Sequence, residues 1–147
     1  MFSQPIDILL VEDNPDDARL TIRVIKKNEL ANNILVLTDG EEALDFIYAK
    51  NKFEQRPVHA LPKVIYLDLK LPKVSGTEVL KELRRAENFK SLPVIIFTSS
   101  KEIKDIAECY NLGANSYIVK PVDYDKFSEV VSSTTKYWLH YNESFHI

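Results

Sequence analysis

Several features that mark other classes of protein are scarce in this chain. The 147 residues contain a single cysteine, Cys109, which excludes an internal disulfide and makes the cytosol the expected compartment. Only three glycines occur, Gly40, Gly76 and Gly113. They are too dispersed to form a glycine-rich loop that cradles phosphates, which argues against a flavodoxin-like cofactor binder.

Membrane and nucleic-acid partners are also disfavoured. No apolar stretch approaches the roughly 20 residues that span a bilayer, and the N-terminus shows no export signal. The net charge is −3 with acidic and basic residues interspersed, which does not suit a nucleic-acid surface. His59, His140 and His146 lie far apart and lack metal-ligand spacing. The length suits one domain over residues 1–147, with a single core.

Four short apolar runs each end on a residue that can do chemistry. The runs cover residues 6–11, 64–67, 94–97 and 117–119, and they are followed by Glu12 and Asp13, by Asp68, by Thr98 and by Lys120. Short β-branched runs are typical of buried strands in a parallel sheet, whose ligands bind beyond the carboxyl ends of the strands. The polar residues that follow the four runs are therefore expected to meet at one edge of the molecule.

Helical patterns alternate with these runs, and residues 34–37 form a further predicted strand. Asn14 and Pro15 begin a first helix, a second is predicted from about Glu41 to Lys50, and three more follow the remaining strands. The apolar stripes of the five helices are Ala18, Ile22 and Ile25; Ala43, Leu44, Ile47 and Tyr48; Val79, Leu80 and Leu83; Ile103, Ile106, Ala107 and Tyr110; and Phe127, Val130, Val131, Thr134 and Trp138. Five alternations predict an α/β fold, a doubly wound (βα)5 three-layer sandwich with a parallel five-stranded sheet in the order 2-1-3-4-5.

The residues at the expected edge suit phosphoryl transfer. Carboxylates brought together repel unless a cation intervenes, and a site with only oxygen ligands that is open to water suits Mg²⁺. A carboxylate such as Asp68 can act as a nucleophile on phosphorus and form an aspartyl phosphate. Lys120, Mg²⁺ and the Thr98 hydroxyl could each cover one oxygen of the transferred group.

Each residue also has a simpler interpretation on its own. Glu12 and Asp13 could cap the first helix, Asp68 could be an ordinary loop acid, and Thr98 could belong to a helix cap. Lys120 could mark only a turn before Pro121. Four such coincidences at four strand ends are improbable together, so the joint interpretation is a phosphoryl site.

With these residues in place, the chain resembles the receiver domains of two-component response regulators from Ile6 to Trp138. The motifs that carry the resemblance are LLVEDN, YLDLKLP, IIFTSS and YIVKP. The resemblance implies that Asp68 accepts a phosphoryl group from a sensor histidine kinase. It further implies that Asp13, Asp68 and the backbone carbonyl of Lys70 bind Mg²⁺ directly, with Glu12 in an outer-shell contact.

Thr98 and Tyr117 would then be the switch pair. The hydroxyl would turn toward the phosphoryl group, and the aromatic ring would rotate inward behind it. Tyr117 has a simpler interpretation as an aromatic residue on an edge strand, which is common.

The remainder after the fifth strand is too short for an effector domain, so a stand-alone receiver is expected rather than a turnover enzyme. Its output would come through protein contact, and the fourth helix, fifth strand and fifth helix could also form a homodimer. Residues 51–63, and the aromatics Tyr137, Trp138 and Tyr141, resemble those of single-domain regulators paired with bacterial phytochromes. The segment 51–63 is either a tolerated surface insertion, which is slightly favoured, or a loop that touches a partner.

Two alternatives remain open. A phosphorylation-independent docking module would keep the site without using it. An aspartate-nucleophile phosphatase of the haloacid dehalogenase kind needs a second acid two residues after the nucleophile, where this chain has Lys70.

Overall fold

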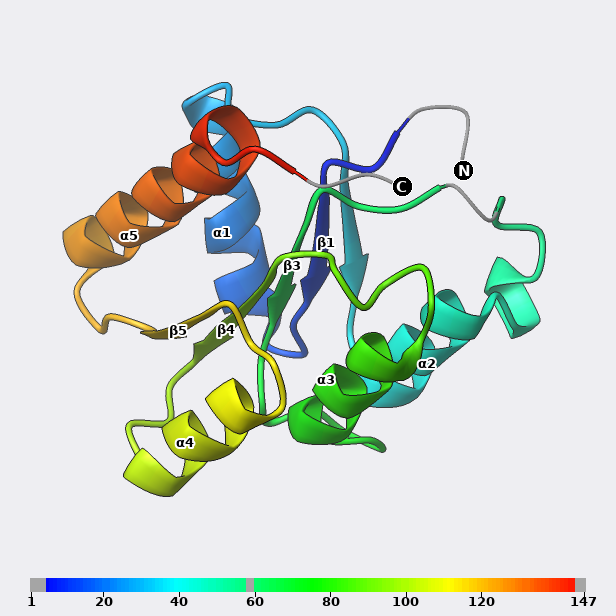
Figure 1. Cartoon of the computed structure of the whole chain (residues 1–147). Helices are drawn as coiled ribbons and strands as arrows, with labels where there is room; N and C mark the ends of the chain where they lie inside the picture. The colour runs from blue at the N-terminus through cyan, green and yellow to red at the C-terminus, as the bar shows by residue number, and fades with distance from the viewer. Residues whose placement is uncertain (1–4, 58–59, 145–147) are drawn as a thin grey trace.

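Five parallel strands form the central sheet of the computed structural model, which describes residues 5–57 and 60–144 (Figure 1). The strands are β1 (Ile8–Val11), β2 (Ile34–Leu37), β3 (Val64–Leu67), β4 (Val94–Thr98) and β5 (Ser116–Val119). Their order is β2-β1-β3-β4-β5, as predicted. β3 and β4 are buried along their whole length, as expected of central strands covered on both faces.

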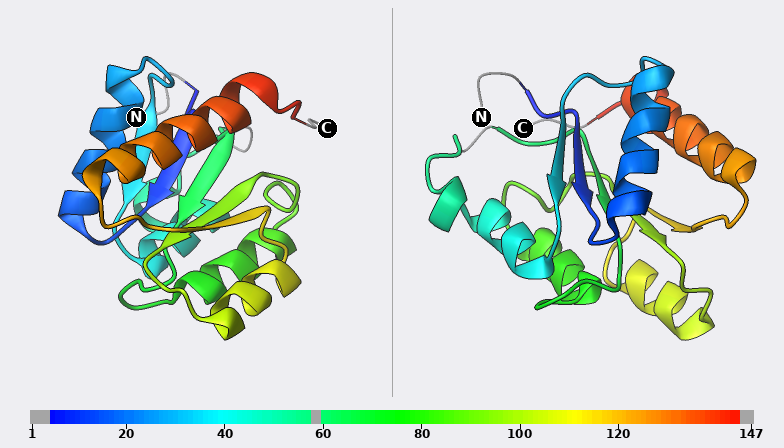
Figure 2. Two further views of the ribbon diagram at one scale, coloured as in Figure 1. Left: turned by 90° about the vertical axis from the view of Figure 1, so that its left-hand side faces the viewer. Right: turned by 180° about the vertical axis from the view of Figure 1, so that it is seen from behind.

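Helices cover both faces of this sheet. In Figures 1 and 2, α1 (Pro15–Lys27) and α5 (Tyr124–Lys136) lie side by side on one face. The opposite face carries α2 (Gly40–Tyr48), α3 (Gly76–Arg85) and α4 (Ile103–Asn111). A short 3-10 helix, η1 (Asn51–Phe53), follows α2, and a π-helix, η2 (Tyr137–Tyr141), extends α5. The predicted doubly wound (βα)5 sandwich is thus confirmed.

Local chemistry explains where the first two helices begin and end. The Asn14 side chain accepts hydrogen bonds from the backbone N–H groups of Asp16 and Asp17, which caps α1 ahead of its first residue, Pro15. Helix α2 ends at Tyr48 rather than near Lys50, because Ala49 takes a left-handed conformation with φ of 53°. A left-handed conformation is uncommon for alanine, and nothing in the sequence predicts it here.

Two apolar layers fill the space between the sheet and its helices. Successive strand residues point to opposite layers, so Leu9 packs toward α2 and α3 while Leu10 packs toward α1 and α5. A buried polar link crosses the second layer, where the hydroxyls of Tyr66 on β3 and Thr135 on α5 lie 2.6 Å apart. This bond joins the strand that precedes Asp68 to the last α-helix.

Helix α4 forms as predicted, but its apolar stripe faces mostly solvent. Ile103 is 83% exposed, Tyr110 is 49% exposed, and Ala107 is also exposed, whereas Cys109 is buried. The reason is the position of the helix beside β5, an edge strand, where little of the sheet lies beneath it. The periodicity predicted the helix correctly, but its apolar stripe does not mark the buried face.

The segment after α2 is more than a surface insertion. Phe53 is 1% exposed and packs edge-on against Phe46. Arg56 is also buried, and its guanidinium donates hydrogen bonds to the carbonyl oxygens of Phe46 at 2.8 Å and Ile47 at 3.0 Å, near the end of α2. The favoured interpretation as a tolerated surface insertion was therefore wrong for this stretch.

Parts of the sequence predictions lie outside the described residues. His59 and His146 are among these, so the expectation about histidine spacing is not tested at either position. Across residues 5–57 and 60–144, no helix has both the length and the apolar character that a membrane span requires.

Candidate functional site

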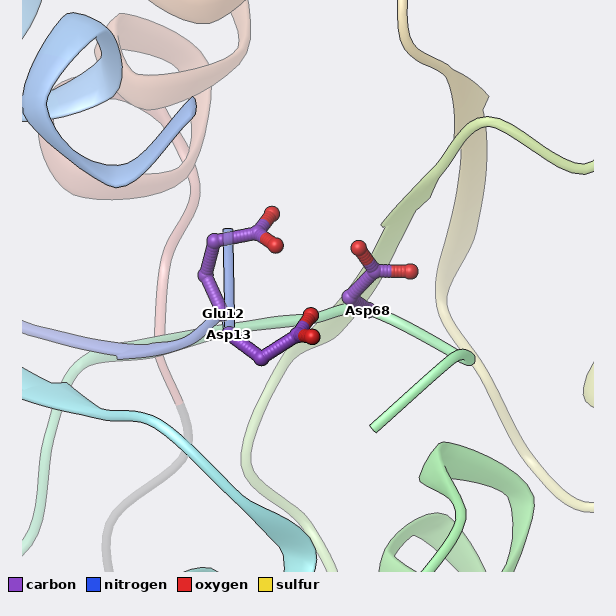
Figure 3. A group of neighbouring side chains, drawn as sticks. All are labelled: Glu12, Asp13 and Asp68. Carbon is purple, nitrogen blue, oxygen red and sulfur yellow. The ribbon is translucent and has the colours of Figure 1, made fainter. Parts of the chain in front are cut away.

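The register of the sheet brings the polar strand ends together. Val11 on β1 pairs with Leu67 on β3, so Glu12, Asp13 and Asp68 follow adjacent strands at the same edge. The backbone N–H of Asp68 donates to the carbonyl of Val11 at 3.1 Å, which continues the pairing one residue further. In Figure 3 the three side chains approach one another from these two strand ends.

This acidic cluster, which comprises Glu12, Asp13 and Asp68, has the chemistry of a divalent-cation site. Each residue can offer a carboxylate oxygen, and these oxygens all lie within 4.8 Å of one another. Glu12 and Asp68 are buried while Asp13 is exposed, so the cluster is open to water on one side. Hard oxygen ligands with room for several waters fit Mg²⁺ or Mn²⁺.

A lysine from the other end of the chain neutralises part of this cluster. The chain continues past β5 with the Lys120 backbone N–H donating to the Thr98 carbonyl at 2.7 Å, which fixes where Lys120 leaves the sheet. Its Nζ lies 2.6 Å from Glu12 Oε1, 2.8 Å from Asp68 Oδ2 and 2.9 Å from Asp17 Oδ2. The Lys120 side chain is only 8% exposed, so its charge depends on these three carboxylates.

The local electrostatics separate the two buried acids. Burial raises the pKa of Glu12 to about 7, because desolvation outweighs the hydrogen bond from Lys120. Burial alone would also raise the pKa of Asp68, but the hydrogen bond and charge of Lys120 hold it below its ordinary value. The pKa of Lys120 is raised, because its carboxylate partners outweigh its own desolvation. Asp68 is therefore kept as the anion, which is the form that can attack phosphorus.

The buried hydroxyl of Thr98 lies next to Asp68. Thr98 is fully buried, and its Oγ1 has no hydrogen-bond partner among the described residues. The hydroxyl contributes less than Lys120 to the low pKa of Asp68, and its geometry falls short of a hydrogen bond. An unsatisfied buried hydroxyl is unusual and suits a site that receives an extra acceptor oxygen.

The loop after Asp68 is held by close backbone packing. Gly76, the first residue of α3, lies so near the loop that an added Cβ would meet the Asp68 carbonyl oxygen at 2.2 Å. The backbone N–H of Lys70 reaches Asp68 Oδ1 at 3.3 Å. The metal contact expected from the Lys70 carbonyl stays a prediction.

Tyr117 lies on β5, the edge strand, and points toward the loop before α4. Its hydroxyl donates to the backbone carbonyl of Ser100 at 2.9 Å. The Ser100 hydroxyl in turn donates to Asp105 at 2.5 Å, so this loop is tied both to β5 and to the first turn of α4. Tyr117 is thus linked to the segment that follows Thr98.

Most of the residues expected at the site do converge, and one further residue joins them. Glu12, Asp13 and Asp68 form the acidic cluster, and Lys120 contacts two of its members. The sequence pattern presents Asp17 only as a favourable acid in the first turn of α1, yet Asp17 is the third partner of Lys120. One sequence signal points to Asp17: the helix that carries it begins directly after the strand end that supplies Glu12 and Asp13.

A doubly wound sheet with an acidic cluster and a lysine at its carboxyl edge defines a receiver, the class of signalling proteins that the motifs resemble. The family model for the response regulator receiver domain matches residues 8–132, and the chain belongs to this family. The chain is 36% identical over 140 residues to the probable methanogenesis regulatory protein FilR2 of Methanothrix harundinacea, covering 95% of this chain and 88% of that protein. It is 34% identical over 135 residues to the response regulator Rcp1 of a Synechocystis strain, covering 92% and 90%.

Solved structures of response regulators share the whole architecture. The Mn²⁺-bound form of Rcp1 superposes with a TM-score of 0.88 at 32% identity, covering 97% of this chain and all of that one. The phosphorylated cyanobacterial phytochrome response regulator RcpA superposes with a TM-score of 0.89 at 29% identity and the same coverage. A metal ion and a phosphoryl group are thus named for two proteins with this fold.

Proposed function

We propose that Asp68 accepts a phosphoryl group from a sensor histidine kinase in a Mg²⁺-dependent transfer, and that the aspartyl phosphate switches contacts with other proteins. The observation that carries the proposal is the place of Asp68, which belongs to the acidic cluster and also lies 2.8 Å from Lys120. The Asp68 side chain therefore belongs to the candidate cation site and also contacts Lys120, the residue proposed to bind the phosphoryl group.

The transfer follows from the charges around Asp68. An Asp68 carboxylate oxygen attacks phosphorus, the bond from phosphorus to the donor atom breaks, and the donor keeps that electron pair. Bound Mg²⁺ would be held by Asp13 and Asp68, with the Lys70 carbonyl and an outer-shell Glu12, and would offset charge on the phosphoryl oxygens. Lys120 moves its contact from the Asp68 carboxylate to a phosphoryl oxygen, and the buried Thr98 hydroxyl donates to another.

Intact mass after incubation with acetyl phosphate tests this proposal. We expect a gain of one phosphoryl group that requires Mg²⁺ and is absent in Asp68→Asn. Asp16→Asn is the matched control, because Asp16 is exposed and lies outside the acidic cluster. A gain that survives in Asp68→Asn would contradict the assignment of Asp68, and a Mg²⁺-independent gain would contradict the requirement for the cation. No gain in the wild-type protein, even when the reaction is quenched early, would favour the phosphorylation-independent docking module.

The switch pair is proposed as Thr98 and Tyr117. In the phosphorylated state the Thr98 hydroxyl turns toward the phosphoryl group and the Tyr117 ring moves inward into the space left behind. The Tyr117 hydroxyl would then leave the Ser100 carbonyl, which frees the loop before α4. Fluorotyrosine at position 117 should show a new ¹⁹F resonance on phosphorylation, and an unchanged resonance would argue against this movement.

The output is proposed to pass through the face built from α4, β5 and α5, which is also where a homodimer would form. Several apolar side chains are exposed on this face or next to it: Ile103, Tyr110, Val122 and Tyr124. The chain spans about nine tenths of FilR2 and of Rcp1, and we propose that it acts as a stand-alone receiver. We also propose that it is cytoplasmic, that it is not a turnover enzyme, and that a phytochrome-type kinase phosphorylates it. Light scattering with and without acetyl phosphate tests the dimer, and an unchanged monomer mass would exclude it.

A further inference from the structure

Asp17 contacts Lys120 without belonging to the acidic cluster. Its Oδ2 lies 2.9 Å from Lys120 Nζ, almost the same distance as the Asp68 oxygen at 2.8 Å. The group of carboxylates that could hold a cation, within residues 5–57 and 60–144, contains Glu12, Asp13 and Asp68 but not Asp17. Asp17 therefore contacts the lysine without joining the carboxylates that could hold the cation.

The backbone holds Asp17 firmly in this position. Its N–H donates to the side chain of Asn14 at 3.1 Å, and its carbonyl accepts the Thr21 hydroxyl at 2.8 Å. The carboxylate leaves from the first turn of α1 and is about one third exposed. Asp16, its neighbour in the same turn, is instead exposed and pairs with Arg19 on the outside of the helix.

An ammonium group has three protons, and in this structure three carboxylates use them. Phosphorylation of Asp68 frees the proton that its carboxylate now takes, and a phosphoryl oxygen accepts it. As long as Glu12 and Asp17 keep the other two protons, the lysine cannot turn fully toward the new oxygens. The carboxylate of Asp17 is not required by the cation, so it remains available to hold the lysine in every state of the site.

We propose that Asp17 is a positioning residue that competes with the phosphoryl group for Lys120 and so limits how tightly the phosphorylated state is held. This inference rests on the proposed function of Asp68. In the unphosphorylated state the Asp17 carboxylate offsets part of the lysine charge that also faces Glu12 and Asp68, which favours cation binding. Loss of Asp17 should therefore weaken Mg²⁺ binding and strengthen phosphoryl binding.

The test uses the full chain and two equilibrium titrations, both measured by calorimetry. One titrates Mg²⁺ alone, and the other titrates fluoroberyllate, a phosphoryl mimic, at saturating Mg²⁺. Asp17→Ala removes the contact, Asp17→Asn leaves a weaker neutral acceptor, and Asp17→Glu restores a carboxylate. Asp16→Ala and Asp16→Asn are the controls, because each removes the same charge from the same helical turn without touching Lys120.

Relative to the Asp16 variants, Asp17→Ala should bind fluoroberyllate roughly threefold to tenfold more tightly, as one charge-assisted hydrogen bond at a partly exposed site predicts. Mg²⁺ binding should weaken by a smaller factor. Asp17→Asn should show part of both effects, and Asp17→Glu should return both affinities toward the wild-type values. In a Lys120→Met background the difference in Mg²⁺ affinity between Asp17→Ala and Asp16→Ala should vanish.

Two results would overturn the inference while leaving the role of Asp68 intact. The first is equal affinities in the Asp17 and Asp16 variants. The second is weaker fluoroberyllate binding in Asp17→Ala, which would mean that Asp17 holds the lysine in place for the phosphoryl group instead of competing with it. If the wild-type protein itself binds no fluoroberyllate, the proposed function fails and the inference fails with it.

Discussion

Replacing Lys120 by methionine should expose the repulsion that the lysine now offsets. Methionine keeps much of the length and the apolar body of lysine, so packing changes little, but the ammonium and its three contacts with Glu12, Asp17 and Asp68 disappear. Glu12 and Asp68 are buried, and breaking a buried ion pair by removing one partner typically costs about 3–5 kcal/mol. Because Asp17 is partly exposed and water reaches the cluster, we expect a loss of about 2–4 kcal/mol in the free energy of unfolding at pH 8.

The pH dependence of this loss follows from Glu12. The pKa of Glu12 in the folded protein is about 7, against an ordinary value of 4.5, so the folded state favours the protonated form of Glu12. The resulting contribution to stability is fully present below about pH 4.5 and is lost as the pH rises through 7. Without the lysine the charged form of Glu12 is still less favourable. The variant should therefore lose stability more steeply than the wild type between pH 5 and pH 8.

Urea denaturation at pH 5.5 and pH 8, with and without Mg²⁺, measures these effects. Mg²⁺ should stabilise Lys120→Met more than the wild type at pH 8, because the cation replaces the missing positive charge. Lys101→Met is a suitable control, since Lys101 is an exposed lysine outside the site. A variant within about 0.5 kcal/mol of the wild type at pH 8 without Mg²⁺ would refute the reasoning, since ordinary surface changes fall in that range.

Two further substitutions test contacts at opposite ends of the sheet, Asp7 before β1 and Gly76 beside the loop that follows Asp68. Burial alone would raise the pKa of Asp7, but the backbone N–H groups of Asn32 and Asn33, with Lys63 nearby, hold it below its ordinary value. Asp7→Asn should thus lower the unfolding free energy by about 1–2 kcal/mol at neutral pH, and the difference should fade as the pH falls through that lowered pKa, which thermal melts between pH 3 and pH 7 would show. Gly76→Ala should cost about 1–3 kcal/mol in urea denaturation, because its Cβ would collide with the Asp68 carbonyl, and an unchanged midpoint would contradict that contact.

The sheet could be predicted because its strands are nearly pure apolar runs. A strand buried on both faces has no alternation to misinterpret, and each of the runs ends where a polar residue must leave the core. Parallel pairing then places those ends at one edge, which is why the order of residues along the chain is enough to bring Glu12, Asp68 and Lys120 together. Strand ends carry positional information that single residues lack.

The features that the sequence did not predict depend on long-range contacts. The side chain of Asp17 satisfies a local rule, that acids favour the first turn of a helix, so nothing in the sequence separates it from Asp16. Arg56 is buried because it caps the carbonyl oxygens at the end of α2 and lies over the rings of Phe46 and Phe89, contacts that no local pattern encodes. The exposed stripe of α4 follows from its place at the sheet edge, which periodicity alone does not reveal.

The charges at the site also determine the order in which ligands can arrive. Three carboxylates, those of Glu12, Asp17 and Asp68, contact the ammonium of Lys120. The exposed Asp13 of the acidic cluster adds a fourth negative charge, so the edge of the sheet repels anions. A phosphoryl group brings a charge of about −1.5 to −2 at pH 7, and it would meet this repulsion directly. A divalent cation removes most of that barrier and keeps Asp68 ionised. Productive encounters should therefore begin with the cation, and the rate of phosphorylation should saturate with Mg²⁺ concentration at every concentration of acetyl phosphate. A rate at zero Mg²⁺ that rises with acetyl phosphate to the same maximum would show that the cation is dispensable and that Lys120 alone overcomes the repulsion.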